Sequence, residues 1–389
     1  MIYYIIFIIL LFLSVVEFYG YIELRIKKCL IFMISLLFIF LSTVRTNVVG
    51  DYYSYKAAYD QIIDVSVPFW KIPFIPHEVG YSLFMYLVKK LSGEFHVFLF
   101  VQACVVIGLQ YKVITYWCEC FKEISTGRRR SFELTAYFIC WAVYIGHVFS
   151  IRNIVAIMIC LYALRYVHDK KIMRFIAFVL LGTSMHISVI VFLAVYPMYW
   201  INASFKLKML GFIVGVITFN KILSVMTDIA MKVLPLRAQA RFSTYLEAGF
   251  GEGSGINDIN LLMLMLIKAI ANIGVVLGIL FLTDQYRRRR KGYLCHRAEY
   301  AYTTIYIVGA VLQIVSTFIN LAFSRISTSY IYFQFPLFIV FLKTFDRTRW
   351  KNIAYAFLIT YILLRFAINM FLEGSGYIPF RTIWSEILL

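Results

Sequence analysis

The chain has 389 residues, of which 62% are hydrophobic and only 15% are charged, and its formal net charge is +18. This composition predicts a membrane protein that crosses the bilayer many times. The positive charge does not indicate nucleic-acid binding, because the basic residues are spread over short loops without interleaved aromatic residues. The seven cysteines lie in apolar runs or beside basic clusters, which argues against disulfides and against a thiolate metal site.

Apolar runs recur along the chain and predict an all-α polytopic protein with about twelve transmembrane helices. In the first half they lie near residues 1–19, 29–44, 95–117, 132–149, 151–167 and 173–186. In the second half they lie near 187–201, 208–224, 260–283, 301–320, 326–343 and 352–370. The first run lacks a basic n-region and a cleavage motif, so we interpret it as a retained span. The runs over 173–201 are short, since a perpendicular helix needs about 20 residues, and we interpret this pair as broken or re-entrant.

Basic clusters between the runs predict the topology, because Lys and Arg accumulate in cytoplasmic loops. The clusters are Arg25 to Lys28, Lys122 with Arg128 to Arg130, Lys170 to Arg174, Lys206 with Lys208, Arg287 to Arg297, and Lys343 to Lys351. Both termini then face outward, and 1–389 forms a single integral membrane domain. Two long loops, at about 45–94 and 221–259, also face outward, and long loops often carry function.

The two outer loops differ in character. The first contains an amphipathic stretch, Gly80 to Lys90, which cannot cross the membrane if the predicted topology holds, and we interpret it as an interfacial helix. The second contains the glycine-rich turn Gly249 to Gly255, for which a flexible linker is favoured over a lid.

Several polar residues near span ends share the predicted outer side and could ring one outward-facing cavity. They are Arg45, Asp51, Glu78, Arg152, His186, Arg241 and Arg325. Arg152 begins a span, where unpaired backbone N–H groups already favour an anion. Arginine adds a planar fork suited to phosphate oxygens. Arg325 is assigned to a turn that starts at Asn320, and His186 to the break of a hairpin.

Snorkelling toward lipid phosphates would explain any one outward arginine about equally well, but it explains the whole set less well. It does account for Lys112 and Arg165, near predicted cytoplasmic ends. Lys268 and Arg365 lie inside apolar runs, where a charge is costly unless it faces a cavity, so both are secondary candidates.

Proton transfer can be assigned to a small set of groups. Asp51 and Glu78 are the outward acids nearest span ends, and either one could act as a general base. His186 could transfer a proton, bind a hydroxyl or phosphate, or act only as a structural hydrogen-bonding group. His77 and His147 are too scattered to form a metal site, so neither a metal nor a cofactor is predicted.

Three stretches resemble the EpsG group of Wzy-type polysaccharide polymerases: Ser150 to Ala156, Lys170 to Phe175, and Met185 to Ile190. Arg45, Gly50 to Tyr55 and Glu78 to Tyr81 are similar to the first outer loop of that family, and Arg325 with Tyr330 to its late arginine-plus-aromatic element. The resemblance runs from about residue 40 to 345. Asn153 stands where the family usually has glutamine.

This resemblance implies a metal-independent membrane glycosyltransferase with a GT-C-like fold in the bacterial cytoplasmic membrane. Such an enzyme joins oligosaccharide repeat units carried on undecaprenyl diphosphate into O-antigen, capsule or exopolysaccharide. Arg152, Arg325 and either Arg45 or Arg241 would stabilise the departing diphosphate. The tyrosines that would stack on sugars are Tyr52, Tyr55, Tyr81 and Tyr330. A repeat-unit flippase and a chain-length regulator are candidate partners.

Two other classes of protein fit the same spans. A transporter, including the repeat-unit flippase itself, is the main alternative, but transporters are often built from internal repeats that this chain does not show. A polytopic acyltransferase is the second, yet the cytoplasmic histidines His168 and His296 have no catalytic neighbours. An assembly subunit without an active site would leave changes at Arg152 or Arg325 silent.

Overall fold

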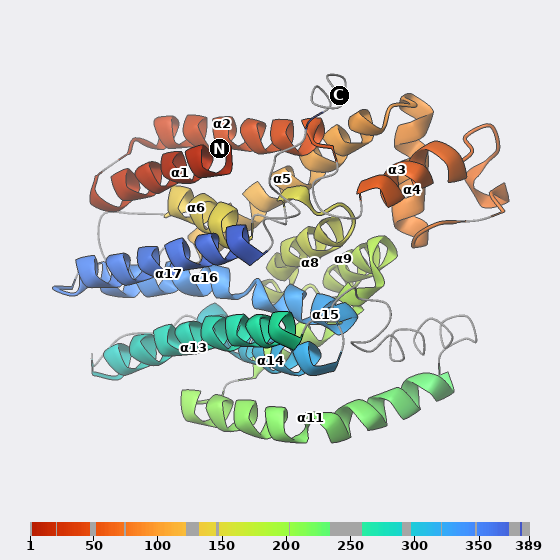
Figure 1. The fold of residues 1–389 in the computed structure, drawn as a ribbon. Helices are drawn as coiled ribbons and strands as arrows, with labels where there is room; N and C mark the ends of the chain where they lie inside the picture. Colours follow the sequence, from red (N-terminus) through yellow and green to blue (C-terminus); the bar gives the residue numbers. More distant parts are fainter. Residues whose placement is uncertain are drawn as a thin grey trace. The chain divides into compact units, whose positions relative to one another are not determined.

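A computed structural model describes residues 2–20, 22–46, 52–73, 75–121, 132–144, 148–201, 203–233, 259–289, 297–319, 321–346, 348–372 and 382. These residues form helices and their connections (Figure 1), and the β-pairing among them is limited to an isolated antiparallel bridge between Arg45 and Thr382. The predicted all-α class is therefore confirmed for the described part of the chain.

Within these ranges, six helical segments are long and apolar enough to cross a membrane. They are Ile2–Tyr19, Phe95–Cys120, Ala269–Tyr286, Arg297–Val315, Ile326–Phe345 and Lys351–Met370. Their length and composition identify the protein as a polytopic membrane protein. The expected total of about twelve crossings stays a prediction.

Shorter helices occupy several of the predicted runs. The run at 132–149 contains α6 (Glu133–Val143), whose 11 residues rise only about 16 Å. The run at 173–201 consists of α9 (Ile172–Met185), the 3-10 helix η4 (Ile187–Ala194) and α10 (Val195–Trp200). His186 caps α9 in an extended conformation, so the predicted break at this residue is confirmed.

The chain divides into two compact units. The first comprises Met1–Ile190 and Leu342–Leu389, and the second comprises Val191–Phe341. The chain passes between them within η4 and again within α16 (Gln334–Phe345). The single membrane domain stays a prediction.

In the first unit, a buried ion pair ties α1 (Ile2–Tyr19) to α2 (Leu24–Val44). The Lys27 ammonium lies 2.8 Å from Glu17 Oε1, and Thr135 donates to Glu17 Oε2 from its backbone N–H at 2.8 Å and its hydroxyl at 3.0 Å. Both charged side chains are almost fully buried. Hydrogen bonds of this kind offset the cost of removing a charge pair from water, so Lys27 fixes the packing of α1, α2 and α6.

A second buried lysine in this unit caps α5 (Phe95–Cys120). Lys343 donates to the carbonyl oxygens of Phe121 at 3.0 Å and Cys118 at 3.3 Å. These carbonyls end the helix, where a positive charge is favoured by the helix dipole. The amide of Asn369 on α17 (Lys351–Leu372) similarly donates to the last carbonyls of α6, at 3.2 Å to Val143.

Four helices of the first unit surround the polar residues of interest: α4 (Val79–Leu91), α5, α8 (Asn153–His168) and α9. The predicted interfacial segment is confirmed as a helix, α4, and its position at the membrane interface stays a prediction. Two glycines bring these helices together. A Cβ atom on Gly80 would lie 2.2 Å from Ser184 Oγ of α9, and one on Gly182 would lie 2.7 Å from Cys160 Sγ of α8.

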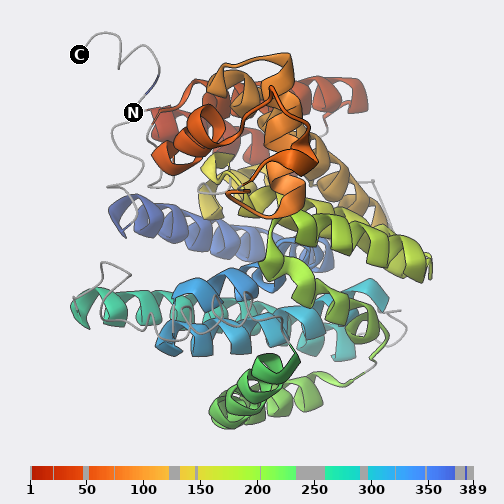
Figure 2. The same cartoon turned by 90° about the vertical axis from the view of Figure 1, so that its right-hand side faces the viewer.

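The direction of α8 relative to its neighbours follows from contacts at both of its ends. Gln102 of α5 donates to the carbonyl of Ile151, two residues before α8, while Tyr116 of α5 lies under the Arg165 guanidinium near the end of α8. The two helices therefore run parallel. α9 runs antiparallel beside α8 (Figures 1 and 2), so the start of α8 and the end of α9 meet.

Much of the segment predicted as the first outer loop is helical in the described residues. It contains α3 (Tyr52–Ala57), a π-helical turn η1 (Ala58–Ile62) and a 3-10 turn η2 (Phe69–Lys71) ahead of α4. The Tyr59 hydroxyl donates to the Ser92 carbonyl at 2.7 Å, and Lys89 donates to the Ile63 carbonyl at 2.7 Å. These contacts fold the loop onto α4.

The second unit contains α10, α11 (Phe205–Val233), α13 (Ile259–Arg289), α14 (Arg297–Ile319) and α15 (Leu321–Ile331). α15 packs closely on α14, since a Cβ atom on Gly309 would lie 2.5 Å from Tyr330 Cβ. Lys208 of α11 donates to the Tyr300 carbonyl of α14 at 2.7 Å.

Helix α11 continues to Val233, past the predicted start of the second outer loop at residue 221, and the position of that loop outside the membrane stays a prediction. One expectation for this unit was wrong. Arg325 was assigned to a turn, yet it lies inside α15. Neither stretch contains glycine or proline, so nothing in the local chain interrupts a helix there. Polar side chains alone do not break a helix.

Candidate functional site

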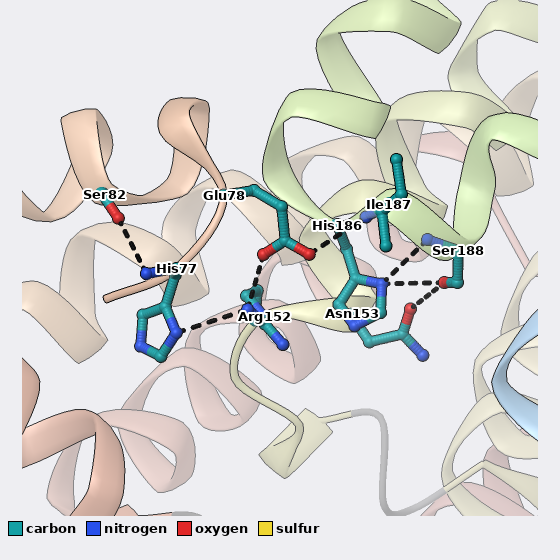
Figure 3. A network of polar contacts seen from close by, with 8 residues as sticks. All are labelled: His77, Glu78, Ser82, Arg152, Asn153, His186, Ile187 and Ser188. Atoms are coloured by element: carbon teal, nitrogen blue, oxygen red, sulfur yellow. Dashed lines mark hydrogen bonds and ion pairs between the residues drawn. The ribbon is translucent and has the colours of Figure 1, made fainter. Parts of the chain in front are cut away.

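Glu78 and Arg152 form an ion pair between the starts of two helices (Figure 3). Glu78 precedes α4 and Arg152 precedes α8, and Arg152 Nη1 lies 2.5 Å from Glu78 Oε2. The other carboxylate oxygen, Oε1, accepts the backbone N–H of Ile187 at 3.2 Å. One carboxylate thus joins α4, α8 and the break after α9. A negative charge is favoured here because the first turns of α4 and α8 present backbone N–H groups that have no partner within their own helix.

Arg152 makes its hydrogen bonds and its ion pair to the described side chains through one nitrogen of the guanidinium. Nη1 makes both of its side-chain contacts, the ion pair with Glu78 and a contact of 3.3 Å with His77 Nδ1. Nε is buried and has no hydrogen-bond partner among the described residues. The Nε and Nη2 donors form the edge that binds two oxygens of a phosphate or carboxylate together. The side chain is 17% exposed and Nε itself is buried, so the guanidinium is largely desolvated.

His77 is a site residue that sequence reasoning did not select. Burial lowers the pKa of His77 to about 4, and the positive charge of Arg152 acts in the same direction. The ring is therefore neutral at pH 7. Its Nδ1 faces a guanidinium, which only donates, so the proton sits on Nε2. Nε2 is buried without a hydrogen-bond partner in the described structure.

His186 is held on the other side of Glu78 in Figure 3. Its Nδ1 accepts the backbone N–H of Ser188 at 3.2 Å and lies 2.8 Å from the Ser188 hydroxyl. That hydroxyl also reaches Asn153 Oδ1 at 3.5 Å. A backbone N–H can only donate, so Nδ1 is an acceptor and the ring proton sits on Nε2. Asn153 therefore links α8 to the break at His186.

A buried glutamine positions the residues around Arg152. Gln102 accepts a hydrogen bond from the Tyr81 hydroxyl at 2.8 Å and donates to the Ile151 carbonyl at 2.6 Å. It therefore links α4 and α5 to the residue that precedes Arg152. In the sequence, Gln102 is visible as a polar amide within an apolar run, but the sequence does not show which residues it contacts.

The tyrosines expected to contact sugars are packed inside the first unit. Tyr81 is fully buried, and Tyr52 is 1% exposed with its hydroxyl 3.3 Å from His96 Nε2. The Tyr55 ring lies 4.8 Å from the His77 ring and 6.0 Å from the Arg152 guanidinium. In this structure the three rings support the site and offer no open face to a sugar, whose stacking stays a prediction.

Arg45 lies near the same group. It ends α2, is fully buried, and its guanidinium is 5.6 Å from the Phe149 ring. Burial raises the pKa of Tyr81 far above its usual range, and the charges of Arg152 and Arg45 both oppose that rise. The charges of two predicted arginines, Arg45 and Arg152, therefore both lower the pKa of Tyr81.

Four of the other predicted residues lie outside the described part of the chain, either entirely or through their side chains. Asp51 and Arg241 lie outside the described residues. Arg325 in α15 and Lys268 in α13 belong to the second unit, and their side chains are also outside the described part.

The remaining two predicted residues are described. Tyr330 is buried in the second unit and donates to the Val191 carbonyl. Arg365 lies on α17 of the first unit, with a buried Nε that has no hydrogen-bond partner among the described residues.

The fold and the site define a polytopic helical membrane protein with an arginine, a carboxylate and two neutral histidines gathered where helices begin and end. The sequence model of the EpsG family matches residues 28–382, so the chain belongs to the EpsG family. This membership confirms the predicted resemblance and places the chain among membrane proteins of polysaccharide biosynthesis. No curated protein and no solved structure matched the chain.

Proposed function

We propose that the protein is a glycosyltransferase that polymerises oligosaccharide repeat units carried on undecaprenyl diphosphate, at the outer face of the bacterial cytoplasmic membrane. The observation that carries this proposal is the guanidinium of Arg152, which is anchored through Nη1 while its buried Nε has no hydrogen-bond partner among the described residues. Family membership supports the polysaccharide as product.

Arg152 would bind the diphosphate that leaves. An acceptor hydroxyl of one repeat unit attacks the anomeric carbon of the growing chain, and the bond between that carbon and the diphosphate oxygen breaks. The acceptor loses a proton, and undecaprenyl diphosphate departs with the bonding electron pair. A guanidinium held at the phosphate stabilises that developing charge, and such preorganised stabilisation is large in a partly desolvated site.

Glu78 would be the base for this reaction, with Asp51 the alternative acid outside the described residues. While Glu78 is paired with Arg152, its carboxylate is a poor base. A diphosphate that binds Arg152 competes for the same guanidinium and would loosen this pair. Substrate binding would therefore activate the base, so that the proton is taken only when the leaving group is in place.

The two histidines would act as neutral donors. His77 and His186 each carry the ring proton on Nε2, because Nδ1 of each ring faces a donor. A neutral N–H can hold a phosphate oxygen or a sugar hydroxyl without giving up its proton. Neither ring is needed as an acid, since a diphosphate is already a good leaving group.

The test compares the length of surface polysaccharide on gels from cells that carry wild type, Arg152→Ala or Arg165→Ala. Arg165 lies on the same helix and stacks on Tyr162 at 4.0 Å, so it is a matched control. We expect Arg152→Ala to leave single repeat units at normal membrane abundance, while Arg165→Ala keeps long chains. Loss of all surface sugar would indicate export instead, and unchanged ladders would contradict the proposed site.

A further inference from the structure

An apolar groove lies between the same four helices that position Arg152. Its volume is about 520 Å³, which is within the range of roughly 300–1,000 Å³ that is usual for ligand sites. Its lining includes Phe84 of α4, Cys104 and Gly108 of α5, Ile159 of α8, and Leu181 and Met185 of α9. Lys112 is the one charged residue in this lining.

The groove begins beside the charged cluster. Met185 directly precedes His186, and Val155, which also lines the groove, lies in the first turn of α8 after Arg152. Phe84 is in the second turn of α4, which starts after Glu78. One end of the groove therefore lies within about one helical turn of Arg152 and directly beside His186, although neither residue lines the groove itself.

From that end, the groove follows the helices away from the site. Gln102 of α5 is level with the start of α8, and Lys112 lies ten residues further along α5, which is about 15 Å of helix. Ile159 of α8 and Phe178 of α9 line the groove on this side. Val105 is 37% exposed and Leu181 is 46% exposed, so the groove is open along its length.

We infer that this groove holds the first isoprene units of a long-chain polyprenyl diphosphate, with the diphosphate at Arg152 and the chain running along α5 and α9. The inference rests on the proposed function. A phospholipid also joins apolar chains to a phosphate, but a polyprenyl diphosphate presents more negative charge to Arg152 and carries it on one long chain, which suits a single continuous groove.

Gly108 offers a way to block the groove without disturbing the helices. A Cβ atom there would meet no other atom within 4 Å, so a tryptophan would project into the groove. Gly274 of α13 is also exposed and equally open, which makes Gly274→Trp the matched control. Because burial of each methylene contributes about 0.8 kcal/mol, displacing two of them would weaken binding roughly tenfold or more.

The probe is a polyprenyl diphosphate with a diazirine in its first isoprene units, used with the full-length protein in nanodiscs that contain a large excess of phosphatidylglycerol. We expect cross-links on α5 between Cys104 and Lys112 and on α9 between Phe178 and Met185. Gly108→Trp should reduce the labelling, with about tenfold weaker saturation, whereas Gly274→Trp should not. Labelling only on other helices, or equal labelling of Gly108→Trp and wild type, would contradict the inference that the groove binds the polyprenyl chain.

A second pair of measurements separates this inference from the proposed function. In Arg152→Ala, an uncharged polyprenol with the same diazirine should still label the groove, while the polysaccharide chains are lost. If Arg152→Ala makes long chains and the groove is still labelled, polyprenyl binding in the groove is supported and the proposed function is contradicted. If Gly108→Trp makes chains of full length and is labelled as the wild type is, polyprenyl binding in the groove is contradicted and the polymerase proposal is unaffected.

Discussion

Arg152 Nη1 lies 2.5 Å from Glu78 Oε2, although the two residues are 74 positions apart and each stands immediately before a helix. The pair fixes the start of α4 against the start of α8. It also sets the charge of the site, because the carboxylate neutralises a partly desolvated guanidinium without occupying all of its donors. The placement of α4 against α8 and the charge of the site thus depend on the same two side chains. Substitutions at Glu78 can separate these two effects.

Replacing Glu78 by glutamine should separate its two roles. The amide oxygen can still accept either from Arg152 or from the Ile187 N–H, so one of the two links made by the carboxylate is kept and the helices should stay close to their places. The amide cannot take a proton at neutral pH. We therefore expect Glu78→Gln to lower the rate of polymer formation in isolated membranes by about 100-fold or more. The melting temperature of the purified protein should change by only a few degrees.

Glu94→Gln is the control for this change, since Glu94 is an exposed acid at the start of α5. It should leave the rate unchanged. Asp51→Asn serves as the comparison within the proposed mechanism and should have the smaller effect of the two. A Glu78→Gln enzyme of near-normal rate beside an inactive Asp51→Asn enzyme would transfer the role of base to Asp51.

A methyl group on Gly80 should disturb the packing of α4 on α9. The added Cβ would lie 2.2 Å from Ser184 Oγ and 2.8 Å from the Ser184 carbonyl oxygen, and the backbone oxygen cannot rotate away. Gly80→Ala should therefore lower the free energy of unfolding by about 1–3 kcal/mol. It should also shorten the polysaccharide, because Glu78 lies two residues away.

The matched control is Gly93→Ala, since Gly93 follows α4 and a Cβ atom there meets nothing within 4 Å. Unfolding in a graded detergent mixture, compared for the two variants, measures the difference. Equal stability of both variants would mean that α4 and α9 approach less closely than the structure shows.

Local patterns in the sequence were enough to locate several parts of the site. Arg152 stands at the join of two apolar runs and His186 interrupts another, and the structure places them at the start of α8 and the end of α9. The amphipathic pattern over Gly80 to Lys90 likewise predicted α4. In each case a local change in hydrophobicity along the chain marks the feature. Such a change can be recognised without knowing which residues pack against it.

Partners across helices were beyond such reasoning. Gln102 appears as one amide in an apolar run, and nothing in the chain shows that it meets Tyr81 and Ile151. His77 was set aside because it has no ligand set nearby in sequence, yet helix packing places it on Arg152. At Arg325 the sequence pattern was misleading in a different way. The polar residues there indicated a turn, yet no residue in this stretch breaks a helix and Arg325 lies within α15.

The link through Gln102 should behave as one cooperative unit. Gln102→Leu removes the acceptor of the Tyr81 hydroxyl and the donor to the Ile151 carbonyl, so two buried polar groups lose their partner. We expect a loss of about 1–3 kcal/mol for each orphaned group. Tyr81→Phe in the same chain removes one of these groups, so the double variant should be more stable than the sum of the single changes predicts. Strict additivity in detergent unfolding would show that the two side chains do not interact.

Stability should depend on His77 in a defined pH range. Burial, together with the Arg152 charge, lowers the pKa of folded His77 to about 4 from 6.5. Between these values the unfolded chain binds a proton at this residue and the folded chain does not, so stability falls as the pH drops from 6.5 toward 4. His77→Asn keeps an oxygen that can accept from Arg152 but does not titrate. Its melting temperature should therefore fall less than that of the wild type over this range, while the control His168→Asn, at an exposed histidine, should follow the wild type. Identical losses in wild type and His77→Asn would mean that His77 is not held neutral against Arg152, and its assignment as a neutral donor would then be wrong.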